Sequence, residues 1–232
     1  MIMLTDCGIR KILVFLFGLV AIFTGYPLES ASHEMNEEGI QEESQETSES
    51  YVLPLSYDDD APLLIIPVPQ TFKLGYDGSS YPDVMYRQFI PCNENINYWS
   101  ELITICQSTE MLDAHGFIRT FKSVMEDSQN LEAYPNYSSY IRCGTERGVK
   151  VGYYVSEHPS FNPHQIGIQA PRYMELLKVK TVQSEDRVWV IQYAVRYDPM
   201  TITDEQRDEL IEKIHNFFRT CKVSSNVTGS PI

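Results

Sequence analysis

The residue types best suited to metal or acid–base chemistry gather between Glu157 and Gln165. This stretch contains Glu157, His158 and His164, whose side chains are all common metal ligands. Its prolines predict an irregular connecting loop. The spacing His-x5-His on such a loop is unlike His-Glu-x-x-His, which places two ligands on one face of a helix. We therefore expect a polar loop with no metal and no cofactor, and keep a metal site as the alternative.

The sequence contains no recognisable catalytic motif. It has no Gly-x-Ser-x-Gly, no phosphate-binding loop of the Walker A type and no Gly-x-Gly-x-x-Gly. Glu94, Glu101 and Asp113 could form a carboxylate pair for hydrolysis, but their spacing does not single them out. We predict no catalytic residues.

Four cysteines lie outside the N-terminal segment: Cys92, Cys106, Cys143 and Cys221. Their irregular spacing, with no Cys-x-x-Cys pair, argues against a zinc site. An even number of cysteines in an exported chain predicts one or two disulfides, with three possible pairings for two bridges. Buried free thiols are the alternative.

Three tyrosines, Tyr134, Tyr137 and Tyr140, cluster around a Pro-Asn turn. Tyrosine is enriched in binding surfaces because it combines a large apolar ring with a hydroxyl group. We identify these three residues as a candidate interaction patch.

The N-terminus has the pattern of a signal peptide. Arg10 and Lys11 precede an apolar run over 12–24, and small residues follow at 30–32. The apolar run is shorter than the roughly 20 residues that span a bilayer. We predict a signal peptide over 1–32. The alternative is an uncleaved signal anchor, which would be the only contact with a membrane.

Acidic residues are concentrated in one stretch. The chain has a net charge of −14; residues 33–60 hold ten acidic residues and no Lys or Arg, and 1–32 hold two of each sign. This leaves 20 acidic and 16 basic residues in 61–232, a net charge of −4. Residues 33–60 are predicted to be a disordered acidic tether. The near-neutral remainder argues against a nucleic-acid partner, which needs clustered Lys and Arg.

The remainder of the chain predicts an α+β domain over 61–221 with a flexible tail over 222–232. Helical spacing of apolar residues predicts two main helices, at about 110–128 and 203–219. β-branched and aromatic runs predict strands at 71–76, 84–90, 99–107, 139–143, 149–156, 173–183 and 187–197. Strands in consecutive runs, separate from the helices, favour a mainly antiparallel sheet.

Two segments carry a family resemblance. One is Pro91-x-x-Glu94-x-x-x-x-Trp99-x-Glu101-x-Ile103-Thr104, and the other runs from Arg187 through Phe218, preceded by His164-Gln165. They resemble small exported bacterial proteins of unassigned function, and the order of elements is similar to that of the PsbP/Mog1-like fold. The resemblance implies a binding or accessory domain and carries over no catalytic residue.

These observations together predict an exported bacterial protein, periplasmic or secreted, that binds a protein or an envelope component without catalysis. The first alternative is a metal-dependent or carboxylate hydrolase that uses the 157–165 loop. The second is a membrane-tethered effector that keeps its signal anchor.

Overall fold

The computed structural model describes residues 50–55, 62–78, 85–108, 113–129, 137–159, 173–185 and 187–224. In chain order the elements are β1 (Ser50–Pro54), β2 (Leu63–Pro67), β3 (Phe72–Asp77), β4 (Tyr86–Pro91), β5 (Glu101–Ser108), α2 (Ala114–Gln129), β6 (Ser138–Glu146), β7 (Val149–Pro159), β8 (Met174–Gln183), β9 (Val188–Tyr197), α3 (Asp204–Thr220) and β10 (Lys222–Ser224).

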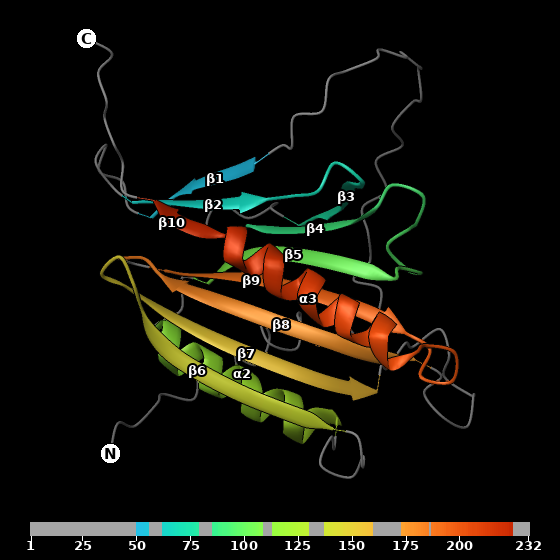
Figure 1. Cartoon of the computed structure of the whole chain (residues 1–232). Coiled ribbons are helices and arrows are strands. Elements are labelled where there is room, and N and C mark those ends of the chain that lie inside the picture. The colour runs from blue at the N-terminus through green and yellow to red at the C-terminus, as the bar shows by residue number, and fades with distance from the viewer. Residues whose placement is uncertain are drawn as a thin grey trace, which may run out of the picture.

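Seven strands form one antiparallel sheet in the order β3-β4-β5-β9-β8-β7-β6 (Figure 1). β5 lies inside the sheet between β4 and β9, as its β-branched, apolar sequence predicts. The expectation of an α+β domain with a mainly antiparallel sheet and two main helices is confirmed in outline. The sheet is the larger part of the domain.

The two helices cover opposite faces of this sheet (Figure 1). α2 packs on β6, β7, β8 and β9, while α3 packs on β8, β9 and the separate strand β2. Side chains along β9 alternate between the two hydrophobic clusters: Val190 and Ala194 lie with α2, Ile191 and Tyr193 with α3. Since both faces are covered, β9 is buried almost throughout.

Local sequence explains where α3 begins. Thr203 and Gln206 form a capping box, and Asp204 and Glu205 place negative charge in the first turn. Its buried residues are Ile214, Phe217 and Phe218.

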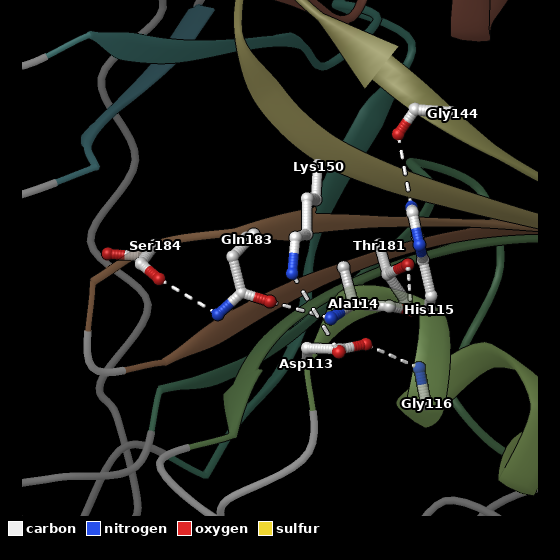
Figure 2. Close-up of polar contacts among 9 residues, drawn as sticks. All are labelled: Asp113, Ala114, His115, Gly116, Gly144, Lys150, Thr181, Gln183 and Ser184. Carbon is white, nitrogen blue, oxygen red and sulfur yellow. Dashed lines mark hydrogen bonds and ion pairs between the residues drawn. The ribbon is translucent and has the colours of Figure 1, made fainter.

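The N-terminal end of α2 is held to the sheet by side chains and backbone (Figure 2). The Ala114 amide donates to Gln183 Oε1 at 2.6 Å, and Thr181 Oγ1 donates to the Ala114 carbonyl at 2.9 Å. His115 Nε2 lies 3.1 Å from the Gly144 carbonyl oxygen on β6. The lone histidine of this helix therefore has a structural contact.

Gly152 on β7 allows this close approach. A Cβ atom there would lie 2.7 Å from Thr181 Oγ1 and 3.0 Å from both the Ala114 carbonyl oxygen and Ile118 Cγ2. Only a residue without a side chain lets α2 sit this close to the strand.

A second, three-stranded sheet has the strand order β1-β2-β10. β1 falls within the predicted tether over 33–60, and β10 within the predicted tail over 222–232. Both are ordered because Leu55, Leu64 and Val223 are buried in the same cluster as α3. Residues 1–49, 56–61 and 225–232 lie outside the described residues, so the signal peptide and most of the tether stay predictions. Within the described part of the chain, no helix is long and apolar enough to cross a membrane.

A basic groove as the candidate functional site

A groove of about 700 Å³ lies on the α3 side of the sheet, beside the C-terminal end of that helix. α3 covers β8 and β9 but leaves β6 and β7 open on this face (Figure 1). The groove occupies that open area and is bounded on its other side by α3 and by the chain entering β10.

Strand register brings the floor residues together. Tyr140, Val155 and Lys178 lie in one row across β6, β7 and β8, and the next row contains Arg142, Tyr153 and Lys180. Side chains two residues apart on a strand share a face, so both rows point to the α3 side. The remaining lining residues are Gly144, Thr145, Glu146, Arg147, Val151, His215, Phe218, Arg219, Cys221, Lys222 and Val223.

The groove is strongly basic. Its lining includes six Lys or Arg side chains and one acidic side chain, that of Glu146; the basic residues are Arg142, Arg147, Lys178, Lys180, Arg219 and Lys222. This concentration of positive charge occurs in a chain whose net charge is −14. A concave basic surface attracts anions.

Lys180 is fixed by its own partners. Its side chain is 1% exposed, and its Nζ donates to Glu146 Oε2 at 2.6 Å and to the Cys221 carbonyl at 3.0 Å. Tyr153 also donates to Glu146, and burial together with this carboxylate raises the pKa of Tyr153. Cys221 is the C-cap of α3, so Lys180 ties the end of the helix to the sheet.

Lys178 is placed differently. Its Nζ lies 5.1 Å from the centre of the Phe218 ring and 5.8 Å from that of Tyr153. Among the described residues no carboxylate forms an ion pair with it. Burial lowers the pKa of Lys178, and the charges of Arg219 and Lys180 lower it further. Its positive charge is therefore poorly compensated.

His215 is a second titratable group in the groove. Burial lowers its pKa, as do the charges of Lys178 and Arg219, while Glu212 acts in the opposite direction. His215, Lys178 and Arg219 line the same groove, so their positive charges oppose one another.

The two described candidate metal ligands, Glu157 and His158, are not brought together. Residues 157–159 belong to strand β7 instead of a loop, so Glu157 and His158 point to opposite faces. Glu157 accepts hydrogen bonds from Arg207, with Nε at 2.8 Å, and from Tyr197. His158 is 2% exposed, and its Nδ1 lies 3.0 Å from the Pro159 carbonyl.

His164 lies outside the described residues, as does the rest of the predicted loop from Ser160 to Gln165. In the part of the chain that the structure describes, no three metal-ligating side chains form a group.

The three carboxylates considered for hydrolysis are also apart. Glu94 accepts from the amide and hydroxyl of Ser100, and Glu101 accepts from Lys213 and Tyr193. Asp113 accepts from the Gly116 amide at the start of α2. Each has a structural role in a different place.

The tyrosine patch is divided by the sheet. Tyr137 donates a 2.5 Å hydrogen bond to Glu126 on α2. Tyr140 faces the opposite side, where it lines the groove and is 52% exposed. Tyr134 lies outside the described residues. Of the predicted patch, Tyr140 alone is seen at the candidate site.

All four described cysteines are free thiols, which corrects the expectation of disulfides. Cys106 packs in the α2-side cluster and Cys221 in the α3-side cluster, so the sheet separates them. Cys143 on β6 is on the same side as Cys106 on β5, but four strand spacings separate these strands, roughly 19 Å. Bridged Cα atoms must lie within about 7 Å of each other. Cys92 is exposed just after β4.

Sequence reasoning missed the groove because it counted charge over the whole domain. The available signal was Lys178-Val179-Lys180 within the mostly buried strand β8. Two lysines at strand spacing share a face. That pattern indicates two positive charges on one face of β8. The sequence does not indicate that Arg142 and Arg219 lie near them.

Comparisons with known proteins give limited information. No protein-family model matches the chain, and no curated protein sequence is similar to it. Among solved structures it is similar to LpqN, involved in cell envelope biogenesis of Mycobacterium tuberculosis, at 14% identity and a TM-score of 0.33, covering 75% of this chain and 91% of that one. It is also similar to the Ran-binding protein Mog1p of Saccharomyces cerevisiae, at 12% identity and a TM-score of 0.38, covering 75% and 93%. The weak PsbP/Mog1-like resemblance is thus found again in the comparison of structures.

Proposed function

We propose that this chain is an exported, non-catalytic binding protein, periplasmic or secreted, that uses the basic groove to hold a component of the bacterial envelope. The observation that carries the proposal is the groove itself. It gathers six basic side chains from β6, the β6–β7 turn, β8 and the α3–β10 segment of a chain whose net charge is −14.

Two further features support a binding role. The groove is built on paired strands and on a helix end fixed by Lys180, so the backbone that carries its charges is in place before any partner arrives. The carboxylates and histidine considered for catalysis have structural contacts: Glu157 with Arg207, Glu101 with Lys213, and His158 with a backbone carbonyl.

Export is proposed from the N-terminal sequence. The intact mass of protein recovered from its host tests it: a chain that begins near Ala31 or His33 has lost its signal peptide. A full-length mass would contradict cleavage and favour the signal-anchored effector.

Binding through the groove is tested by co-sedimentation with the envelope fraction of the host. We expect the charge-reversal variant Arg142→Glu/Lys178→Glu to lose most of the binding shown by the unmodified protein. Lys73→Glu changes an exposed lysine on β3, the strand farthest from β6, and is the matched control. Equal binding by both variants would refute the groove as the binding surface.

A further inference from the structure

We infer that the groove is a site for an organic phosphate ester, with its phosphate group beside Lys178 and the rest of the ligand along Tyr140. This inference rests on the proposed function and names the chemical class of its ligand. Four features of the groove carry it: the uncompensated charge of Lys178, the number of cations nearby, the volume, and the position of Glu146.

Lys178 marks where the anionic group sits. It is half-buried between the rings of Tyr153 and Phe218, at 5.8 and 5.1 Å, without a carboxylate partner among the described residues. Lys180, two residues away, already donates to Glu146 and to a backbone carbonyl. An incoming anion would therefore gain most from Lys178.

The number of cations favours phosphate over a single carboxylate. Arg142 and Arg219 line the groove together with Lys178, and Arg219 also forms an ion pair with Glu212 at 2.7 Å. A carboxylate has two oxygens and one charge, which one arginine can satisfy. A phosphate monoester has close to two charges and three free oxygens at neutral pH, which suits several cations that approach from different strands.

The groove is too large to be filled by inorganic phosphate alone. About 700 Å³ is within the range of roughly 300–1,000 Å³ that is typical of small-molecule sites. Tyr140 is 52% exposed and lies in the same cross-strand row as Lys178, separated from it by Val155. This apolar wall is suited to a ring or an acyl-bearing group attached to the phosphate.

Glu146 sets the orientation. It lies at the Lys180 end of the lining, where its charge disfavours a second anion. The phosphate is therefore expected beside Lys178, on the side away from Glu146 and within reach of Arg142 and Arg219, and the apolar part along Tyr140.

The direct test is isothermal titration calorimetry of the mature full chain with phenyl phosphate, inorganic phosphate and phenol. We expect phenyl phosphate to bind at least tenfold more tightly than inorganic phosphate or phenol. Lys178→Gln and, separately, the exposed Arg142→Gln should each weaken it about tenfold, while Lys73→Gln leaves it unchanged. Because Arg142 is exposed, its variant gives an answer even if Lys178→Gln impairs folding.

A second arm identifies the source of the phosphate. Vesicles of phosphatidylcholine with 20% phosphatidic acid, a lipid whose headgroup is a phosphate monoester, are compared with pure phosphatidylcholine by co-sedimentation. Binding to the anionic vesicles that Lys178→Gln reduces, and Lys73→Gln does not, assigns the phosphate to a lipid headgroup. Binding of phenyl phosphate alone assigns it to a soluble ester.

Failure to bind phenyl phosphate at millimolar concentration, together with equal sedimentation on both vesicle types, would overturn the inference. Equal effects of Lys178→Gln and Lys73→Gln would also overturn it. Envelope binding that is lost in Arg142→Glu/Lys178→Glu would in that case leave the proposed function standing, with a ligand of another class.

Discussion

Replacing Gly152 with alanine should destabilise the domain by forcing α2 away from the sheet. The new Cβ atom would lie 2.7 Å from Thr181 Oγ1, 3.0 Å from the Ala114 carbonyl oxygen and 3.0 Å from Ile118 Cγ2. Two of these three neighbours are themselves joined, because Thr181 Oγ1 donates to the Ala114 carbonyl at 2.9 Å. The strand cannot accept a methyl group without disturbing that bond.

The magnitude follows from the crowding. Inserting a methyl group into a packed interior costs about 1–3 kcal/mol, and weakening the Thr181 hydrogen bond adds about 1 kcal/mol. We therefore expect Gly152→Ala to lower the free energy of unfolding by about 2–4 kcal/mol. A domain of this size loses roughly 2–4 °C of melting temperature for each kcal/mol, so the midpoint should fall by about 4–16 °C.

Gly144→Ala is the matched control. A Cβ atom at Gly144 meets nothing within 4 Å, and the residue does not have a positive φ. Alanine there should leave stability unchanged or raise it by up to about 1 kcal/mol, since it reduces the freedom of the unfolded chain. Urea denaturation followed by circular dichroism measures both variants.

A double variant locates the cause. Thr181→Ala removes the closest atom, so Gly152→Ala/Thr181→Ala should lose less stability than the sum of the two single changes, by about 1 kcal/mol. Equal midpoints for Gly152→Ala and Gly144→Ala would refute the reasoning, because the two sites would then tolerate a side chain equally well.

Three further predictions follow from the contacts of buried groups. Lys180→Met should lower the free energy of unfolding by about 3 kcal/mol, measured by urea denaturation, because it removes the ammonium donor of the Cys221 carbonyl and of Glu146 Oε2; an unchanged midpoint would contradict this. Burial alone would raise the pKa of Glu157, but the hydrogen bonds from Arg207 and Tyr197 and the charge of Arg207 lower it. A carboxylate with a lowered folded-state pKa stabilises the fold above its unfolded value, and this contribution disappears as the pH falls through the folded value. Arg207→Leu should thus be less stable than the unmodified domain at pH 7, by about 1 kcal/mol because the arginine is partly exposed. This difference in stability should shrink below about pH 4. A difference that stays constant with pH would contradict a stabilising Arg207–Glu157 ion pair. Without any reductant, the exposed Cys92 should react first with a thiol reagent. The fully buried Cys106 should react only on unfolding, and so should Cys221, because burial raises its pKa to about 12. Thiols that appear only after reduction would show that disulfides form.

The elements of the large sheet and both helices were predictable because each has a strong local pattern. Thr203 and Gln206 mark the start of α3, and β-branched runs mark β5, β8 and β9. The short strands β1 and β10 have no such pattern. Leu55, directly after β1, and Val223, on β10, are far apart in the sequence but are buried in the same hydrophobic cluster. That contact depends on the tertiary fold.

The candidate site was less predictable than the fold. Glu157 and His158 looked like neighbouring ligands in a loop, but a strand turns adjacent side chains to opposite faces. The basic residues of the groove are spread from Arg142 to Lys222, and only the register of β6, β7 and β8 with the end of α3 brings them together. Local sequence indicates the face of Lys178 and Lys180. It gives no distance to Arg142 or Arg219.

The pairing of β10 with β2 affects when the domain can be completed. Lys222, Val223 and Ser224 pair with Ile65, Leu64 and Leu63, residues made more than 150 positions earlier. During synthesis β2 therefore lacks one of its two neighbours until the last ordered strand of the described chain has emerged. Contacts so distant in sequence form late, because a long loop must close first. The core around Leu64 and Val223, together with the groove wall formed by Lys222 and Val223, thus belongs to the finished polypeptide, and a chain in transit across a membrane would not yet have it.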